Sequence, residues 1–152
     1  MKVKMRIEGT KELTRKLRAF GKDGEIRMSD VAFKSAQRMR SEAEASRRTY
    51  SETIQQFIGD IKFFPNVEGA NAYEVFVSNV PMSAYVEFGT GAKVKIPDGW
   101  HDVAQEFFVN GEGTLPPFPY FIPAFNKVKA TYQTDLKDEL NRLVKQYNGS
   151  TR

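Results

Sequence analysis

The chain has no cysteine, one histidine and one tryptophan among its 152 residues. Without cysteine it can form no disulfide and offers no thiolate to zinc, and a single histidine excludes a metal site built on two imidazoles. No apolar run approaches the ~20 residues that a membrane-spanning helix needs. Residues 1–7 alternate apolar and basic side chains, unlike the apolar centre of a signal peptide. We expect a soluble protein that is made in the cytoplasm and binds no metal.

The size and charge of the chain are those of an ordinary globular domain. Its length favours a single domain over residues 1–152, and 40% of the residues are hydrophobic. The net charge is +4, but the 23 basic residues are interleaved with 19 acidic ones. A scattered excess of this kind is more typical of a solvated surface than of a nucleic-acid site, although it is compatible with contact with DNA.

A catalytic site is hard to assemble from these residues. His101 lies between Asp98 and Asp102 in a segment without the strand–turn–helix pattern of a serine nucleophile. The Gly-Thr-Gly sequence at residues 89–91 lacks the Lys-Ser/Thr that completes a phosphate-binding loop. We expect neither an enzyme nor a bound cofactor.

The most distinctive stretch is residues 84–91, Ala-Tyr-Val-Glu-Phe-Gly-Thr-Gly. A proline before it and Gly89 after its last apolar residue are the usual boundaries of a short helix. Such a helix would turn Met82, Tyr85 and Phe88 inward. A strand is the alternative, because residues 85–88 are β-prone.

Glu87 is the carboxylate of this stretch and lies among its aromatic residues. A general acid would need a second carboxylate on the same wall, and the sequence points to none. We predict a structural role, in which Glu87 accepts hydrogen bonds from backbone amides of the following loop or from an arginine.

Hydrophobic periodicity predicts an α+β fold. The expected elements are, in chain order, a strand at 2–8, a helix at 10–20, a long helix at 25–48, two hairpin strands at 56–64 and 73–78, and an amphipathic helix at 124–147. We expect an antiparallel sheet of about three to five strands, packed against the long helix and with the C-terminal helix on one face. Asn148-Gly149 is typical of a helix C-cap, so residues 148–152 are predicted to be a flexible tail.

The least regular segment is residues 92–119, which we expect to be a long loop or insertion. Asn110-Gly111 is typical of a hairpin tip, which would add two short strands. Four aromatic residues of the segment would be exposed unless a partner covered them. They are Trp100, Phe107, Phe108 and Phe118.

Two motifs of the chain resemble a known family. Residues 84–91 and the later Pro-Tyr-Phe-Ile-Pro-Ala at 119–124, followed by an amphipathic helix, resemble small neck proteins of lambda-like long-tailed bacteriophages. These are the tail-component or tail-completion proteins (minor tail protein Z-like), which lie where the head meets the tail. The resemblance is strongest over residues 84–91 and 117–124, and the order of elements around them also fits. The stretch between the motifs is longer here than is typical of the family.

The resemblance implies a structural protein of the virion and no enzymatic activity. It implies assembly into a ring, a hexamer or dodecamer, at the head-proximal end of the tail, after synthesis in the host cytoplasm. The implied neighbours are further copies of the chain, the tail tube, the tail terminator and the head connector, with DNA passing close by and no membrane. Completion, terminator and head-closure roles all stay open.

The expected protein interface combines the first motif with the aromatic residues of the long loop. Burial of these aromatic side chains on assembly would be opposed by the ordering of the loop. The interface residues are Tyr85, Glu87, Phe88, Gly89, Thr90, Gly91, Trp100, Phe107, Phe108 and Phe118.

A nucleic-acid-binding module is the alternative function. It would use the basic faces of the helix at 25–48, with Arg38, Arg47 and Arg48 closest to the phosphates. Three acidic residues interrupt that face, which favours a solvated surface. Binding to DNA that weakens steeply with salt would distinguish this alternative.

Overall fold

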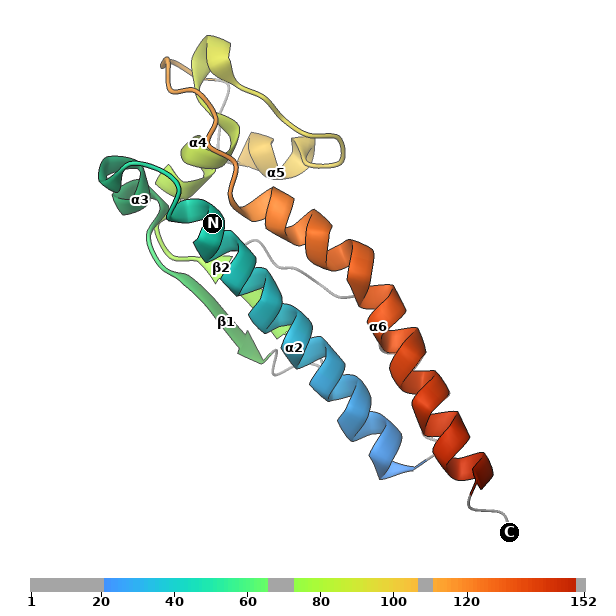
Figure 1. The fold of residues 1–152 in the computed structure, drawn as a ribbon. Helices are drawn as coiled ribbons and strands as arrows, with labels where there is room; N and C mark the ends of the chain where they lie inside the picture. Colours follow the sequence, from blue (N-terminus) through green and yellow to red (C-terminus); the bar gives the residue numbers. More distant parts are fainter. Residues whose placement is uncertain (1–20, 66–72, 107–110, 150–152) are drawn as a thin grey trace.

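The computed structural model describes residues 21–65, 73–106 and 111–149 (Figure 1). In these residues the fold is mixed, with long helices and a two-stranded antiparallel sheet. The strand and the helix predicted at residues 2–8 and 10–20 lie outside the described residues. In the part of the chain that is described, no helix combines the length and the apolar composition that a membrane crossing requires.

Two long helices, α2 (Lys22–Arg47) and α6 (Phe121–Gly149), lie side by side and antiparallel (Figure 1). The buried face of α2 consists of small and flexible residues, which lets neighbouring elements approach its backbone closely. Its buried residues are Gly24, Met28, Ala32, Ser35, Ala36, Met39 and Ala43. The long helix was thus predicted correctly, with its start displaced from residue 25 to Lys22.

The hairpin consists of β1 (Ile61–Pro65) and β2 (Tyr73–Val77), with Ile61 opposite Val77. Its inner face packs on α2, where the Phe33 ring meets the rings of Phe63 and Tyr73 edge to face, each with centroids 5.6 Å apart. Because α2 lies between the hairpin and α6, α6 packs mainly on α2 (Figure 1). We expected α6 on a face of the sheet, and that arrangement is wrong.

The first hairpin strand was predicted to begin at residue 56, but a helix, α3 (Glu52–Ile58), occupies this stretch. The Ser51 side chain accepts a hydrogen bond from the Ile54 backbone N–H at 3.5 Å and caps the helix start. Gly59, with φ of 72°, ends it. The capping residues therefore outweigh the short apolar alternation that suggested a strand.

The central stretch forms a helix, α4 (Met82–Phe88), which ends at Gly89 with φ of 80°. The helical prediction is confirmed and the strand alternative is wrong. The inward face differs from the expected one, since Ala84, Val86 and Glu87 are buried with Phe88 while Tyr85 is only half-buried. Two faces of this short helix are therefore enclosed.

The segment at 92–119 contains more helix than predicted. A 3₁₀ turn, η2 (Gly91–Lys93), follows α4, and α5 (His101–Glu106) comes next. Its described residues include no strand, so the predicted short strand after the hairpin tip is not found, whereas Asn110 of the tip and the predicted strand before it, at 107–109, lie outside the described residues.

The C-terminal helix α6 begins at Phe121 instead of residue 124, and it includes residues 148 and 149 of the predicted tail. Val128, Tyr132 and Leu143 of its apolar stripe are buried. The main core gathers α3, α4, the hairpin and the start of α6 around α2, and a smaller cluster of Met28 and Leu143 lies farther along the helix pair.

Candidate functional site

The carboxylate of Glu87 joins α4 to the start of α6. Its Oε2 accepts hydrogen bonds from the backbone N–H groups of Tyr120 and Phe121, and its Oε1 accepts one from Ile122, each at 2.9 Å. The side chain is almost fully enclosed, with 2% of its surface exposed. The two motifs that carry the resemblance therefore meet in space through one buried side chain.

This arrangement satisfies the whole N-terminus of α6. The first backbone N–H groups of a helix, from the N-cap to the third helical residue, have no partner within it. In α6 these positions are residues 120–123. Three of the N–H groups donate to Glu87, and the fourth position is Pro123, which has no N–H. The negative carboxylate also lies at the positive end of the helix dipole.

The surroundings of Glu87 are apolar, and this affects two titratable groups. Burial raises the pKa of the Glu87 carboxyl above its ordinary value of 4.5, and the three backbone donors oppose that change. Burial and the charge of Glu87 raise the pKa of Tyr120 well above 10, with Ser83 and Arg47 acting in the opposite direction. The Tyr120 phenol therefore keeps its proton at physiological pH.

The Gly-Thr-Gly turn after α4 packs tightly against residues 113–115. The Thr90 N–H donates to the Leu115 carbonyl, and the Leu115 N–H donates to Thr90 Oγ1, both at 2.9 Å. Gly91 has φ of 52°, and a Cβ there would collide with the Gly113 carbonyl oxygen. A Cβ on Gly89 would lie 3.0 Å from the Leu115 carbonyl oxygen. The glycines are thus required by close approach of two backbones as well as by φ.

Hydrogen bonds to α4 and to Tyr50 also hold the extended residues 118 and 119, just before α6. The Phe118 N–H donates to the Val86 carbonyl at 2.7 Å, and the Phe118 ring meets the Tyr50 ring edge to face at 5.3 Å. The Tyr50 hydroxyl donates to the Pro119 carbonyl at 2.8 Å. We call residues 84–91 together with 113–122 the Glu87 junction.

The predicted interface residues occupy different depths of this junction. Glu87, Phe88 and Gly89 are buried within the chain, whereas the other described residues of the set are half-buried. Trp100 meets the Phe125 ring edge to face at 5.4 Å, so it is partly covered by its own chain and not exposed as expected. The same holds for Phe118. The half-buried residues are Tyr85, Thr90, Gly91, Trp100 and Phe118, and Phe107 and Phe108 lie outside the described residues.

The three arginines predicted to lie near DNA have different surroundings. Arg38 forms an ion pair with Asp135 of α6 at 3.2 Å, and Arg47 forms one with Glu44 at 3.1 Å. Arg48 is exposed. Two of the three thus contact acidic side chains of their own chain, which weakens the case for a phosphate-binding stripe.

The sequence prediction for Glu87 was correct in kind. Its partners are backbone amides, but they belong to the start of α6 and not to the loop after α4. Pro123 was the available signal, because proline is well tolerated in a first helical turn, where its missing N–H costs nothing. The roles of Tyr50 and Tyr120 were missed, and no local pattern marks them.

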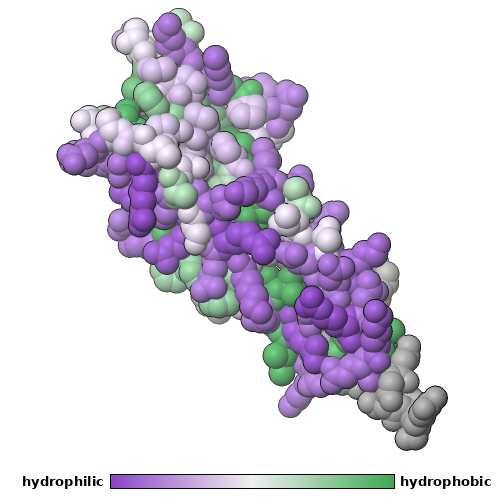
Figure 2. Space-filling view, in the orientation of Figure 1, coloured by the Kyte–Doolittle hydropathy of each residue, from purple (hydrophilic) through white to green (hydrophobic). Residues whose placement is uncertain are grey.

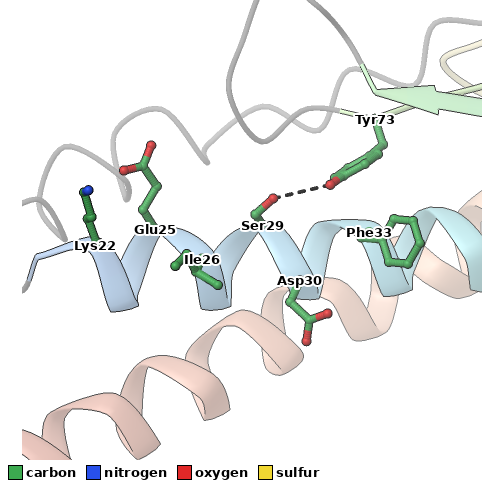
Figure 3. Close-up of a pocket in the computed structure, with 7 residues that line it drawn as sticks. All are labelled: Lys22, Glu25, Ile26, Ser29, Asp30, Phe33 and Tyr73. Carbon is green, nitrogen blue, oxygen red and sulfur yellow. Dashed lines mark hydrogen bonds between the residues drawn. The ribbon is translucent and has the colours of Figure 1, made fainter.

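A groove lies on α2, away from the Glu87 junction, and contains none of the predicted site residues. Figure 3 shows Ser29 of α2 facing Tyr73 of β2, with the two hydroxyl oxygens 3.3 Å apart. One basic side chain and two acidic ones lie among apolar and hydroxyl-bearing ones in its lining, so the groove favours no single ligand chemistry. The lining residues are Lys22, Glu25, Ile26, Ser29, Asp30, Phe33 and Tyr73.

Comparison of the chain with protein-family models, curated proteins and solved structures finds no match. Within the described residues, no three His, Cys, Asp or Glu side chains gather as metal ligands would, and His101 is exposed at the start of α5. The interpretation of the Glu87 junction therefore depends on its own geometry and on the two sequence motifs.

Proposed function

We propose that the protein is a structural component of the neck of a long-tailed bacteriophage. In this role it is a head–tail joining or tail-completion protein that forms a ring at the head-proximal end of the tail. The observation that carries the proposal is the set of three hydrogen bonds from the start of α6 to Glu87, which makes one unit of the two motifs behind the resemblance. The two motifs thus occur in one chain because the first supplies the acceptor and the second supplies the donors of the same contact.

A ring subunit must hold its contact surfaces at fixed angles, because small errors accumulate around the ring and prevent closure. The Glu87 junction is suited to this task, since it fixes the start of α6 to α4 through a buried charge. In the proposed ring, Tyr85, Thr90 and Trp100 border the contacts between subunits, and Glu87 and Phe88 support that surface from beneath. The strand predicted at residues 2–8 would extend the hairpin toward a sheet of three to five strands.

Rings can be tested directly with the purified protein. We expect electron micrographs of the protein, alone or mixed with tail tubes and head connectors, to show closed rings of sixfold or twelvefold symmetry. Light scattering across protein concentrations should show the corresponding mass. Absence of any ring and of any binding to these assemblies would contradict the proposal. Binding to DNA with a steep salt dependence would then favour the nucleic-acid alternative.

A variant can link ring formation to the junction. Thr90→Val keeps the size of the side chain but removes the hydroxyl that accepts the Leu115 N–H. We expect it to lower the fraction of protein in rings while the monomer stays folded by circular dichroism. Thr53→Val, at an exposed position of α3, is the matched control and should form rings as the unmodified protein does.

A further inference from the structure

The outer face of the hairpin carries a pair of stacked aromatic rings. Phe64 and Phe76 have ring centroids 5.3 Å apart and planes inclined by 19°. Phe64 is 52% exposed, although it lies on a strand whose inner face packs on α2. We call the four side chains Lys62, Phe64, Glu74 and Phe76 the outer hairpin face.

An aromatic stack with one exposed ring, Phe64, and one half-buried ring, Phe76, suggests an interaction surface. A single exposed apolar residue is common and needs no explanation, but adjacent aromatic rings held rigidly on a strand pair are enriched where partners bind. The inner face of the same strands is already used, since Phe63 and Tyr73 contact Phe33 of α2. A partner of the outer hairpin face must therefore come from elsewhere than α2.

The register of the hairpin makes this face complementary to itself. Lys62 lies opposite Phe76 and Phe64 lies opposite Glu74, so the two rings occupy one diagonal of a square and the two opposite charges occupy the other. A two-fold axis along the diagonal that joins the two phenyl rings places the outer hairpin face of a second copy against that of the first. Each phenylalanine then meets its own counterpart, and each Lys62 meets Glu74 of the second copy.

We propose that the outer hairpin face binds a second copy of this chain, face to face about that two-fold axis. The contact is isologous, so both copies use the same residues. The proposal does not rest on the ring-forming role, because a closed ring of six or twelve subunits needs heterologous contacts, in which two different surfaces meet. The face is small compared with the ~800 Å² per partner of a stable complex, so association should be weak and dependent on concentration.

The charges on this face select the orientation more than they add affinity. The Lys62 ammonium lies 3.7 Å from the carboxylate of Asp60, the residue just before β1, and Glu74 also has an interaction within its own chain. These contacts remain compatible with the second copy, because an exposed ammonium or carboxylate can serve more than one partner. Stacking of the phenylalanines supplies most of the attraction, as aromatic pairs do elsewhere.

Charge exchange gives the sharpest test. In sedimentation equilibrium, Lys62→Glu alone and Glu74→Lys alone should each weaken association about tenfold, because each places two like-charge pairs in the dimer. An equimolar mixture of the two variants should associate as the unmodified protein does, since each variant complements the other. Rescue by mixing cannot come from contacts within one chain.

Several outcomes would overturn the proposal. The proposal is wrong if the unmodified chain stays monomeric at every concentration. It is also wrong if the mixture of the Lys62→Glu and Glu74→Lys variants associates no better than either variant alone. Phe64→Ala should also weaken association, roughly tenfold, whereas Ile26→Ala, at a 64% exposed residue of α2, should not. Equal effects of these two substitutions would point to non-specific association.

Cross-linking supplies an independent measurement that needs no change of charge. The chain has no cysteine, so a single introduced thiol can pair only between chains. Because the proposed axis passes through the two copies of Phe64, Phe64→Cys should form a disulfide-linked dimer under mild oxidation. Ile26→Cys is the matched control and should stay mostly monomeric. Equal cross-linking of both variants would contradict the two-fold arrangement.

Discussion

The Glu87 junction and the α2–α6 helix pair are stabilised in different ways. The junction depends on a few long-range contacts that concentrate on single atoms, above all the two oxygens of Glu87. The helix pair depends on a long stripe of small residues, supplemented by ion pairs at its surface such as Lys127–Glu42 at 2.7 Å. Contacts between the helices are thus many and individually weak.

This difference implies different responses to substitution. Removing one surface ion pair leaves the helix stripe intact, and such pairs contribute little because water screens them. Removing the carboxylate of Glu87 leaves three buried backbone donors without acceptors at once. The polar face of the helix pair, which Figure 2 shows as mostly hydrophilic residues, can therefore vary more freely than the junction.

The largest expected effect follows from Glu87→Ala. Three N–H groups lose a charged acceptor in a dry site, so we expect the free energy of unfolding to fall by about 4 kcal/mol or more. Glu87→Gln should cost less, because its amide oxygen still accepts, although its NH₂ group faces a backbone donor. Urea denaturation monitored by circular dichroism would measure both losses.

A small carboxylate can test whether the lost acceptor is the cause. Formate fits the space that Glu87→Ala opens at the start of α6, and it should raise the stability of this variant more than that of the unmodified protein. Glu42→Ala, which removes the half-buried partner of Lys127, is the control and should show no specific rescue. No difference between formate and chloride at equal ionic strength would count against the capping role of Glu87.

Gly91→Ala should have the second largest effect, about 2–3 kcal/mol, because the φ of this residue is unfavourable for alanine and the new methyl group meets backbone. The collision is with the Gly113 carbonyl, which belongs to the facing segment of the junction. Gly99→Ala is a close control, since Gly99 also has positive φ, of 82°, but has no atom within 4 Å of a Cβ. The difference in stability between the variants measures mainly the collision with Gly113.

The same contrast explains what the sequence could predict. The buried residues of α2 recur every three or four positions, and because this period is visible in the sequence, the helix was predicted almost completely. The Glu87 junction has no period, because Glu87 and its three backbone donors lie more than thirty positions apart in the chain. The sequence predicted that Glu87 accepts backbone hydrogen bonds, but only the fold identifies residues 120–122 as the donors. Likewise, the strand expected from residue 56 was wrong because Ser51 and Gly59 determine α3 by capping.

A smaller effect is expected from Glu139→Gln in the helix pair. A hydrogen bond from Arg27, helped by Arg142, holds the pKa of the Glu139 carboxyl below its ordinary value of 4.5. A lowered native pKa contributes stability that is present above the unfolded value and lost as pH falls through the native one. We expect a loss of less than about 1 kcal/mol at pH 7 that disappears in acid. Asp138→Asn, at an exposed position of α6, is the control for a simple change of net charge.

The smallest effect should come from Tyr132→Phe. The Tyr132 hydroxyl is buried without a hydrogen-bond partner among the described residues, so its removal at pH 7 breaks no bond and should not lower the free energy of unfolding. Tyr50→Phe, the same substitution in the junction, should cost about 1 kcal/mol because the bond to the Pro119 carbonyl is lost.

Alkaline pH tests the burial of Tyr132 in the helix pair. Burial raises the pKa of Tyr132 to about 12, from an ordinary value of 10. Because the native pKa is the higher one, the stability that this residue contributes is complete below pH 10 and decreases as pH rises toward 12. Tyr132→Phe should therefore flatten the decline of the melting temperature over this range. An equally steep decline in the variant would show that the helix pair does not hold Tyr132 in a dry environment.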